Sequence, residues 1–320
     1  TSLPSTQSVT PPSVPSAEPI LFLVRAALDR LVQDLVHDGR SAAVVAITLA
    51  LDDKIQYLAY SSLKQAIERH RAKAGGIVVL DARTGEILAL ANLPTYNPNN
   101  RERLAGAQLR NRAFTDTFEP GSTMKPFTIA LGLEKGKYRY DTPIQTAPGR
   151  LVVGNATIHD AHVHGLLTVA QVIQKSSNVG SAKIALSMPA EDMWSTFDEL
   201  GFGTPLRLGF PGEVGGRLRP WRKWQPIEQA TMAYGHGISV TLIQLARAYM
   251  AFARDGDLIP LSLTKVDGAP LNGRPVLSAQ TAKEVRAMLE LVVLPGGTAP
   301  KAQVPGYRVA GKTGTAHKLE

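Results

Sequence analysis

Cysteine is absent from the 320 residues of this chain, and this excludes disulfide bonds and thiolate metal sites. The absence leaves the redox compartment open. It is compatible with an oxidising compartment such as a periplasm, where an unpaired thiol is a liability.

Long apolar runs are also lacking. No stretch reaches the roughly 18 consecutive apolar residues that a membrane-spanning helix needs. The basic start, apolar core and small-residue cleavage site of a signal peptide do not occur together either. We therefore expect none of these residues to cross a membrane.

The chain does have enough apolar content for a core. Apolar residues make up 44% of it, and 320 residues suffice for one large or two ordinary domains. The formal net charge of +8 permits a basic surface that could meet nucleic acid, anionic lipid or an acidic polymer. Charge alone does not choose among these partners.

Composition and periodicity divide the chain into three parts. Residues 1–18 are rich in Ser, Thr and Pro and are expected to form a flexible segment. Residues 19–51 form a helical or linker segment, with helical spacing at 19–37 and an apolar stretch at 42–51 that predicts a strand. Residues 52–320 form the main domain. Within it we expect helices at 52–67, 122–134, 168–176, 179–187, 191–200, 226–233, 240–254 and 279–291, and strands at 77–80, 86–91 and 308–316.

The segment 119–127, Glu-Pro-Gly-Ser-Thr-Met-Lys-Pro-Phe, is the centre of the functional interpretation. A Pro-Gly turn precedes Ser122, and the apolar residues that follow have the spacing of a buried helix, so Ser122 is expected at a helix N-terminus. The unpaired N–H groups of a first turn stabilise a nearby oxyanion. Lys125 lies on the same face and can approach the Ser122 hydroxyl.

The pattern Ser-x-x-Lys is weak by itself, because two other places in the chain match it. Ser61 with Lys64 and Ser262 with Lys265 have the same spacing. For any single match, a helix cap beside a solvated lysine is the more common explanation.

What distinguishes Ser122 is the order of two later motifs. Gln-Lys-Ser-Ser-Asn-Val-Gly contains Ser176, Ser177 and Asn178, and Ala-Gly-Lys-Thr-Gly-Thr-Ala contains Lys312, Thr313, Gly314 and Thr315. Taken alone, the Ser-Ser-Asn residues would be read as the end of one helix and the cap of the next. Ser-x-x-Lys, then Ser-x-Asn, then Lys-Thr-Gly is the three-part signature of penicillin-recognising serine acyltransferases.

The chain resembles the class B penicillin-binding proteins over residues 48–318. Besides the three motifs, the resemblance includes Thr-Gly-Glu-Ile-Leu-Ala-Leu-Ala-Asn at 84–92, Tyr-Asn-Pro-Asn-Asn at 96–100 and Tyr-Gly-His-Gly at 234–237. Within the class it is most similar to the division-specific septal transpeptidases of the penicillin-binding protein 3 type. The resemblance implies an α+β fold with an antiparallel sheet, flanking helices and a mostly helical subdomain.

The residue types suit acyl transfer. Ser122 is the expected nucleophile and Lys125 its expected base, provided that burial or a neighbouring cation lowers the lysine pKa from about 10.4. Lys312 would supply that cation. Ser176 can pass a proton to the leaving nitrogen, and the Asn178 amide can both bind the substrate backbone and accept from Lys125.

Further residues are expected to bind the substrate. Thr313 and Thr315 can bind a substrate carboxylate, and Gly314 leaves room for a ligand to lie along the strand. Ser177 is also expected to bind the substrate. By resemblance, the backbone N–H groups of Ser122 and Thr315 form the oxyanion hole. We expect no cofactor and no metal.

The resemblance implies a peptidoglycan D,D-transpeptidase that acts on D-Ala-D-Ala stem peptides and is acylated by β-lactam antibiotics. One alternative is a hydrolase of the same fold, a D,D-carboxypeptidase or β-lactamase. The chain lacks the Glu-x-x-Leu-Asn pattern of class A β-lactamases, and Ser-Ser-Asn differs from the class D motif. Another alternative is a non-catalytic β-lactam-binding or scaffold module.

Relatives of this class extend beyond the present sequence. They carry a membrane helix and a pedestal domain before the catalytic domain, and two strands and a helix after Lys-Thr-Gly. We interpret the chain as a fragment of an enzyme at the periplasmic face of the inner membrane that meets cell-division proteins. We expect its activity to be weak or absent, because the strand with Lys312 lacks its neighbour unless another segment such as 42–51 replaces it.

Two other patterns have plain explanations. His159, Asp160, His162 and His164 lack the helical spacing of a metal site and are expected to form a loop. The basic and aromatic residues of 217–224 could stack bases or meet lipid, but a solvated loop near the cleft is favoured over both. We therefore expect no nucleic-acid partner.

Overall fold

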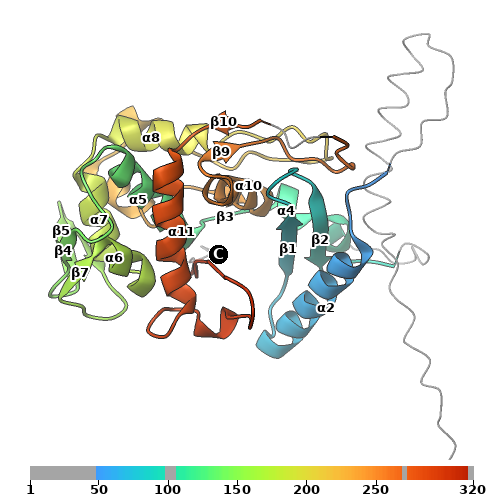
Figure 1. Cartoon of the computed structure of the whole chain (residues 1–320), viewed down its shortest axis with the longest axis horizontal. Helices are drawn as coiled ribbons and strands as arrows, with labels where there is room; N and C mark the ends of the chain where they lie inside the picture. The colour runs from blue at the N-terminus through green and yellow to red at the C-terminus, as the bar shows by residue number, and fades with distance from the viewer. Residues whose placement is uncertain (1–47, 98–105, 269–271, 316–320) are drawn as a thin grey trace, which may run out of the picture.

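The computed structural model describes residues 48–97, 106–268 and 272–315. The flexible segment expected at 1–18, the helix expected at 19–37 and most of the stretch 42–51 lie outside the described residues. In Figure 1, α11 runs between a helical lobe, made of α5 to α9 with β4 to β7, and a hairpin lobe, made of α2, β1, β2 and α4. The described helices are α2 (Asp53–His70), α3 (Gly106–Leu109), α4 (Arg112–Thr115), α5 (Lys125–Glu134), α6 (Val169–Lys175), α7 (Asn178–Leu186), α8 (Ala190–Glu199), α9 (Pro226–Met232), α10 (Leu242–Ala253) and α11 (Ala279–Val293).

The described strands are short and pair two by two, all antiparallel. The pairs are β1 (Gly75–Leu80) with β2 (Ile87–Leu93), β3 (Thr117–Phe118) with β8 (Val240–Thr241), β4 (Pro143–Gln145) with β7 (Leu166–Thr168), β5 (Arg150–Val153) with β6 (Ala156–His159), and β9 (Asp257–Leu258) with β10 (Arg274–Pro275). Three 3₁₀ turns accompany them, η1 (Gly121–Met124), η2 (Trp221–Lys223) and η3 (Pro300–Ala302).

The hairpin lobe follows the predicted helix and strands. The Asp52 carboxylate accepts from the N–H groups of Lys54 and Ile55 and begins α2, and Arg71 in a left-handed conformation ends it. The apolar face of α2 then packs on β1 and β2. Gly85 adopts φ +77°, and this left-handed conformation allows the tight turn between the strands.

The main core surrounds α5 in the helical lobe. This helix is apolar nearly all round, which is typical of a helix buried on every side. Phe127 lies against the rings of Phe202, Tyr249 and Phe252 at centroid distances of 5.5, 5.2 and 5.0 Å. α11 packs on α5, α6 and α10, and the main core also includes Ile87 and Leu90 of β2 and Phe114 of α4, so it extends into the hairpin lobe. The seven helices predicted between 122 and 291 all form, with ends that differ by a few residues.

The strand predicted at 308–316 is wrong for its described part, because residues 308–315 are not paired into any strand. An extended segment becomes a strand only when its N–H and C=O groups pair with a neighbour. Among the described residues, the one backbone hydrogen bond within 308–315 runs from Gly311 N–H to the Leu289 carbonyl of α11, at 3.2 Å.

The suggestion that 42–51 replaces the neighbour of this segment is also not supported by its described part. Leu49 forms an antiparallel bridge with Thr264, and the Ala50 N–H donates to the Leu263 carbonyl at 2.9 Å. These residues therefore pair with 262–265 and not with 308–315.

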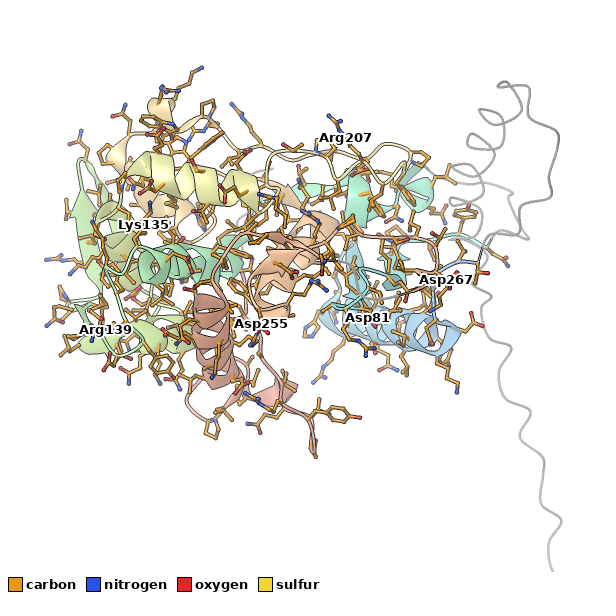
Figure 2. All side chains as sticks on the ribbon, turned by 45° about the horizontal axis from the view of Figure 1, so that its top comes forward. Asp81, Lys135, Arg139, Arg207, Asp255 and Asp267 are labelled. Atoms are coloured by element: carbon orange, nitrogen blue, oxygen red, sulfur yellow. The ribbon has the colours of Figure 1, made fainter. Side chains whose placement is uncertain are left out.

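Charged side chains cover the outside of both lobes. Figure 2 labels Lys135 and Arg139 on the helical lobe and Asp81 and Asp267 at the other end of the molecule. Within the described ranges, no helix combines the length and the apolar character that crossing a bilayer requires.

Candidate active site

Ser122 lies in η1, a 3₁₀ turn that leads directly into α5. The α-helix begins at Lys125, three residues later than predicted. Gly121 adopts φ +57°, and a Cβ at this position would lie 2.3 Å from the Thr315 carbonyl oxygen. A glycine is therefore required here, because the backbone at Thr315 passes directly against the turn that carries Ser122.

Lys125 is fully buried, at 0% exposure, and its amine points into a small polar cluster. Its Nζ lies 2.9 Å from Ser122 Oγ, 3.0 Å from Ser176 Oγ and 2.5 Å from the Ser176 carbonyl oxygen. Burial holds the pKa of Lys125 well below 10.5, and the nearby charge of Lys312 lowers it further, while Asp160 acts in the opposite direction. A neutral amine beside a serine hydroxyl is the arrangement that a general base requires.

Ser176 connects the two lysines. It ends α6 in a left-handed conformation, at φ 59°, and Ser177 begins α7, so the pair sits in the sharp turn between two helices. Its Oγ also accepts from Lys312 Nζ at 2.8 Å. One hydroxyl therefore touches both amines, and burial lowers the pKa of Lys312 to about 8.

Asp160 binds the turn between α6 and α7 through its side chain. Its carboxylate accepts from Ser177 Oγ at 2.7 Å and from the Val179 N–H at 2.9 Å. The Asn178 side chain donates to the neighbouring His159 carbonyl at 2.9 Å. The described residues contain no hydrogen bond between Asn178 and Lys125, although the sequence interpretation expected one.

The sequence pattern predicts a loop at Asp160, but it does not predict this contact with the Ser-Ser-Asn turn. An acidic residue in a polar loop does not indicate which distant main chain it will bind. Across the described ranges, no group of three or more metal-binding side chains comes together.

Residues 312–315 approach the cluster as an extended segment. Lys312 Nζ donates to Ser176 Oγ and to the Thr313 carbonyl, the latter at 3.1 Å. A Cβ at Gly314 would lie 2.9 Å from the Thr123 methyl group and 3.0 Å from the Pro120 carbonyl, so the segment runs closely along η1. Within the described part of the chain, the main-chain N–H groups of Ser122 and Thr315 donate to no other main-chain group.

The structure thus brings Ser122, Lys125, Ser176 and Lys312 into one cluster, with Ser177 and Asn178 beside it and Thr313 to Thr315 along its edge. The two other Ser-x-x-Lys matches are different. Lys265 lies 3.4 Å from the Glu86 carboxylate, and Ser61 with Lys64 lies within α2, where Lys64 is exposed.

The basic and aromatic segment 217–224 leads into α9 and makes contacts both with this helix and within itself. Arg219 pairs with Glu228 of α9 at 2.6 Å, and Arg222 lies over the Trp221 ring at 4.7 Å.

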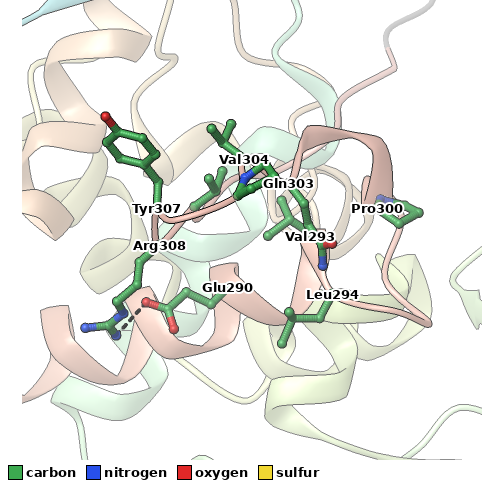
Figure 3. A pocket seen from close by; sticks show the side chains of 10 residues that line it. Glu290, Val293, Leu294, Pro300, Gln303, Val304, Tyr307 and Arg308 are labelled. Atoms are coloured by element: carbon green, nitrogen blue, oxygen red, sulfur yellow. Dashed lines mark hydrogen bonds and ion pairs between the residues drawn. The ribbon is translucent and has the colours of Figure 1, made fainter.

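A separate cavity of about 570 Å³ lies between the C-terminal half of α11 and residues 300–309 (Figure 3). An ion pair of 2.7 Å between Arg308 and Glu290 closes one side of it. None of the residues in the polar cluster lines this cavity, so it is not the site of the chemistry.

Comparison with known proteins agrees with the motifs. Residues 75–320 match the family model described as the penicillin binding protein transpeptidase domain. The probable peptidoglycan D,D-transpeptidase PenA of Neisseria gonorrhoeae is 50% identical over 273 residues, which are 85% of this chain and 46% of that protein. The peptidoglycan D,D-transpeptidase FtsI of Escherichia coli K12 is 40% identical over 290 residues, 91% of this chain and 49% of that protein.

Solved structures give the same result. The apo structure of the TP domain from Burkholderia pseudomallei penicillin-binding protein 3 has a TM-score of 0.79 and 50% sequence identity, and the match covers 85% of this chain and 78% of that one. The chain spans about half the length of the curated relatives that it matches. On these motifs, this geometry and these matches, the chain belongs to the penicillin-binding protein transpeptidase domain family.

Proposed function

We propose that this chain is the catalytic part of a peptidoglycan D,D-transpeptidase that cross-links stem peptides through an acyl-serine intermediate. The observation that carries this proposal is the Lys125 amine, which is fully buried and lies 2.9 Å from the Ser122 hydroxyl oxygen. The names of the relatives PenA and FtsI support peptidoglycan as the substrate class.

The reaction begins with attack by Ser122. The neutral Lys125 amine takes the hydroxyl proton while Ser122 Oγ forms a bond to the carbonyl carbon of the penultimate D-Ala, and the carbonyl electron pair moves onto oxygen. The main-chain N–H groups of Ser122 and Thr315 stabilise this oxyanion. The nearby charge of Lys312 keeps Lys125 neutral at a lower pH, because it disfavours a second positive charge.

The intermediate then collapses. The carbon–nitrogen bond to the terminal D-Ala breaks, and the proton held by Lys125 passes through Ser176 Oγ to the leaving amine. An amine from a second stem peptide attacks the acyl-serine in the next step. Lys125 takes a proton from this amine, and its return to Ser122 Oγ releases the cross-linked product and restores the enzyme.

Ligand binding uses the edge of the cluster. Lys312, Thr313 and Thr315 bind the terminal carboxylate, and Asn178, held by the His159 carbonyl, binds the stem-peptide backbone. A β-lactam presents a strained amide and a carboxylate at similar positions and acylates Ser122 as a mimic of D-Ala-D-Ala.

The cellular setting that we propose follows the resemblance to septal transpeptidases. The enzyme would act at the periplasmic face of the inner membrane during septal wall synthesis, with cell-division proteins as partners. The D-Ala-D-Ala stem peptides are its substrates and β-lactam antibiotics its covalent inhibitors.

A fluorescent penicillin tests the proposal. Mass spectrometry of the labelled chain should find the adduct on Ser122, Ser122→Ala should abolish it, and Ser61→Ala, at the matching motif in α2, should leave it unchanged. An adduct that persists is expected of a transpeptidase, whereas rapid release would indicate a β-lactamase or carboxypeptidase. A folded chain without any adduct would contradict the proposal and favour a binding or scaffold role.

A further inference from the structure

A turn at residues 294–299 follows α11 and lies beside the active-site cluster. The Gly297 N–H donates to the Leu294 carbonyl, and the Ala299 N–H donates to the Val292 carbonyl, both at 2.9 Å. A Cβ at Gly297 would lie 2.2 Å from the Val292 oxygen, and Gly296 adopts φ +85°. Two glycines therefore let the chain reverse directly over the end of the helix, which fixes the position of the turn.

This turn is tied to both segments that meet at Ser176. The Gly296 carbonyl accepts from Lys175 Nζ at 2.8 Å, and Lys175 is the last residue of α6, directly before Ser176. On the other side, Thr298 Oγ1 lies 2.8 Å from Thr313 Oγ1, and Thr313 follows Lys312. The turn thus joins the end of α6 to the extended segment 312–315.

We propose that Thr298 is a positioning residue for the binding of the substrate carboxylate. Each hydroxyl has one proton to donate and can also accept a hydrogen bond. When Thr298 donates into Thr313 Oγ1, the Thr313 proton is left to point at an anion beside Lys312. This assignment rests on the proposed function, because it takes the ligand to be an acyl donor with a terminal carboxylate.

The position of this hydrogen bond favours a functional role over a structural one. Both threonines are exposed, so their hydrogen bond replaces bonds to water and contributes little to folding. Residues 308–315 have no strand partner among the described residues, and so side-chain contacts of this kind decide how Thr313 faces the cluster. Thr298 touches no reacting atom and acts through Thr313.

Equilibrium binding to the full chain carrying Ser122→Ala tests this inference without acylation. The ligands are benzylpenicillin and its methyl ester, which lacks the negative charge. In this background, Thr298→Val should weaken benzylpenicillin binding by about three- to tenfold, the range expected of one hydrogen bond, and leave ester binding unchanged. Thr298→Ser, which keeps the hydroxyl, should restore binding of benzylpenicillin.

A double-mutant cycle with Thr313→Val completes the test. If Thr298 acts through Thr313, Thr298→Val has no further effect once Thr313 has lost its hydroxyl. Three results would each overturn the inference. Thr298→Val could weaken binding of the penicillin and of the ester equally, the two substitutions could have additive effects in the cycle, or the Ser122→Ala parent could bind the two ligands equally.

The same measurements separate this inference from the proposed function. If the chain with native Ser122 forms no adduct, yet the Ser122→Ala chain binds benzylpenicillin better than the ester in a Thr298-dependent way, the proposed reaction fails and the positioning role stands. If Ser122 is acylated but Thr298→Val binds benzylpenicillin as its parent does, the positioning role fails and the reaction stands.

Discussion

The two halves of the active site are held in different ways. Ser122, Lys125 and Ser176 lie on η1, at the start of α5 and at the end of α6, where buried helices fix the backbone. Residues 313–315 are instead exposed and Lys312 is half-buried. Residues 312–315 have no strand pairing among the described residues, and a few contacts to Ser176, Thr298 and η1 hold them.

Catalysis and ligand recognition therefore depend on different parts of the structure. The nucleophile and its base need a buried environment, because burial is the main cause of the lowered Lys125 pKa. Ligand recognition needs an open edge where a peptide can lie. We expect changes in the helix-held half to abolish the chemistry, and changes in the extended half to alter affinity and pH dependence.

The largest effect should come from Lys125→Met in the helix-held half. Methionine fills similar space, but it cannot accept the Ser122 proton, and loss of a general base costs about 10²- to 10⁴-fold in rate. The second-order rate of acylation by a fluorescent penicillin measures this change. A variant that retains more than a tenth of the parent rate would show that Lys125 is not the base.

The same variant should change the pH dependence of stability. Lys125 is protonated in the unfolded chain up to about pH 10.5, but its folded pKa is lower, so the unfolded state binds more protons between these values. The free energy of unfolding therefore rises with pH across that window. The lowered pKa of Lys312 adds a further rise in this free energy between about pH 8 and 10.5. Urea unfolding at several pH values should show a smaller rise in Lys125→Met.

A pair of glycine substitutions compares a position packed against the helix-held half with an open position on the segment that leads to residues 312–315. Gly235 and Gly306 have similar φ angles, +84° and +81°, but only a Cβ at Gly235 meets another backbone, 2.1 Å from the Gly121 oxygen. Gly306→Ala should cost about 1–2 kcal/mol for the left-handed conformation alone. Gly235→Ala should cost clearly more and displace Ser122, as urea unfolding and acylation rates would show; equal costs would contradict this.

In the extended half, Lys312→Gln should slow acylation at neutral pH by about 10- to 100-fold, the worth of a charged hydrogen bond. Removal of this positive charge should also raise the Lys125 pKa, so the rising limb of the pH–rate profile should move to higher pH. With the methyl ester of the penicillin, the pH shift should remain while the loss of rate becomes smaller. A profile that keeps its position would mean that Lys312 does not influence Lys125.

The sequence predicted the helix-held half well, because its signals are local. The spacing of Ser122 and Lys125 and the apolar run behind them depend on one turn and one helix. The Ser-Ser-Asn turn was found by its order relative to the other motifs, and the structure places its Ser176 within hydrogen-bond distance of both lysines.

The extended half was predicted less well, because strand formation depends on partners that the local sequence does not encode. The sequence predicts a strand at 308–316, yet residues 308–315 form none. The contacts that Asp160 and Thr298 make were not predicted for the same reason. Their partners, Ser177 and Thr313, lie 17 and 15 residues away in the sequence, and only folding reveals them.

The smallest effect is expected from Asp160→Asn, which tests how far the helix-held half depends on charge from outside it. The asparagine oxygen can still accept from the Val179 N–H, and its NH2 group can donate to Ser177 Oγ in place of the lost acceptor, so the turn should keep its shape. Because the Asp160 charge raises the Lys125 pKa, its removal should move the rising limb of the pH–rate profile to lower pH and change the neutral rate by less than about tenfold. Asp160→Ala is the control: it shifts the profile in the same direction, but it also leaves donors unpaired and should lose about 1–3 kcal/mol of stability. A shift to higher pH in Asp160→Asn would show that the carboxylate acts through the geometry of Ser176 and not through its charge.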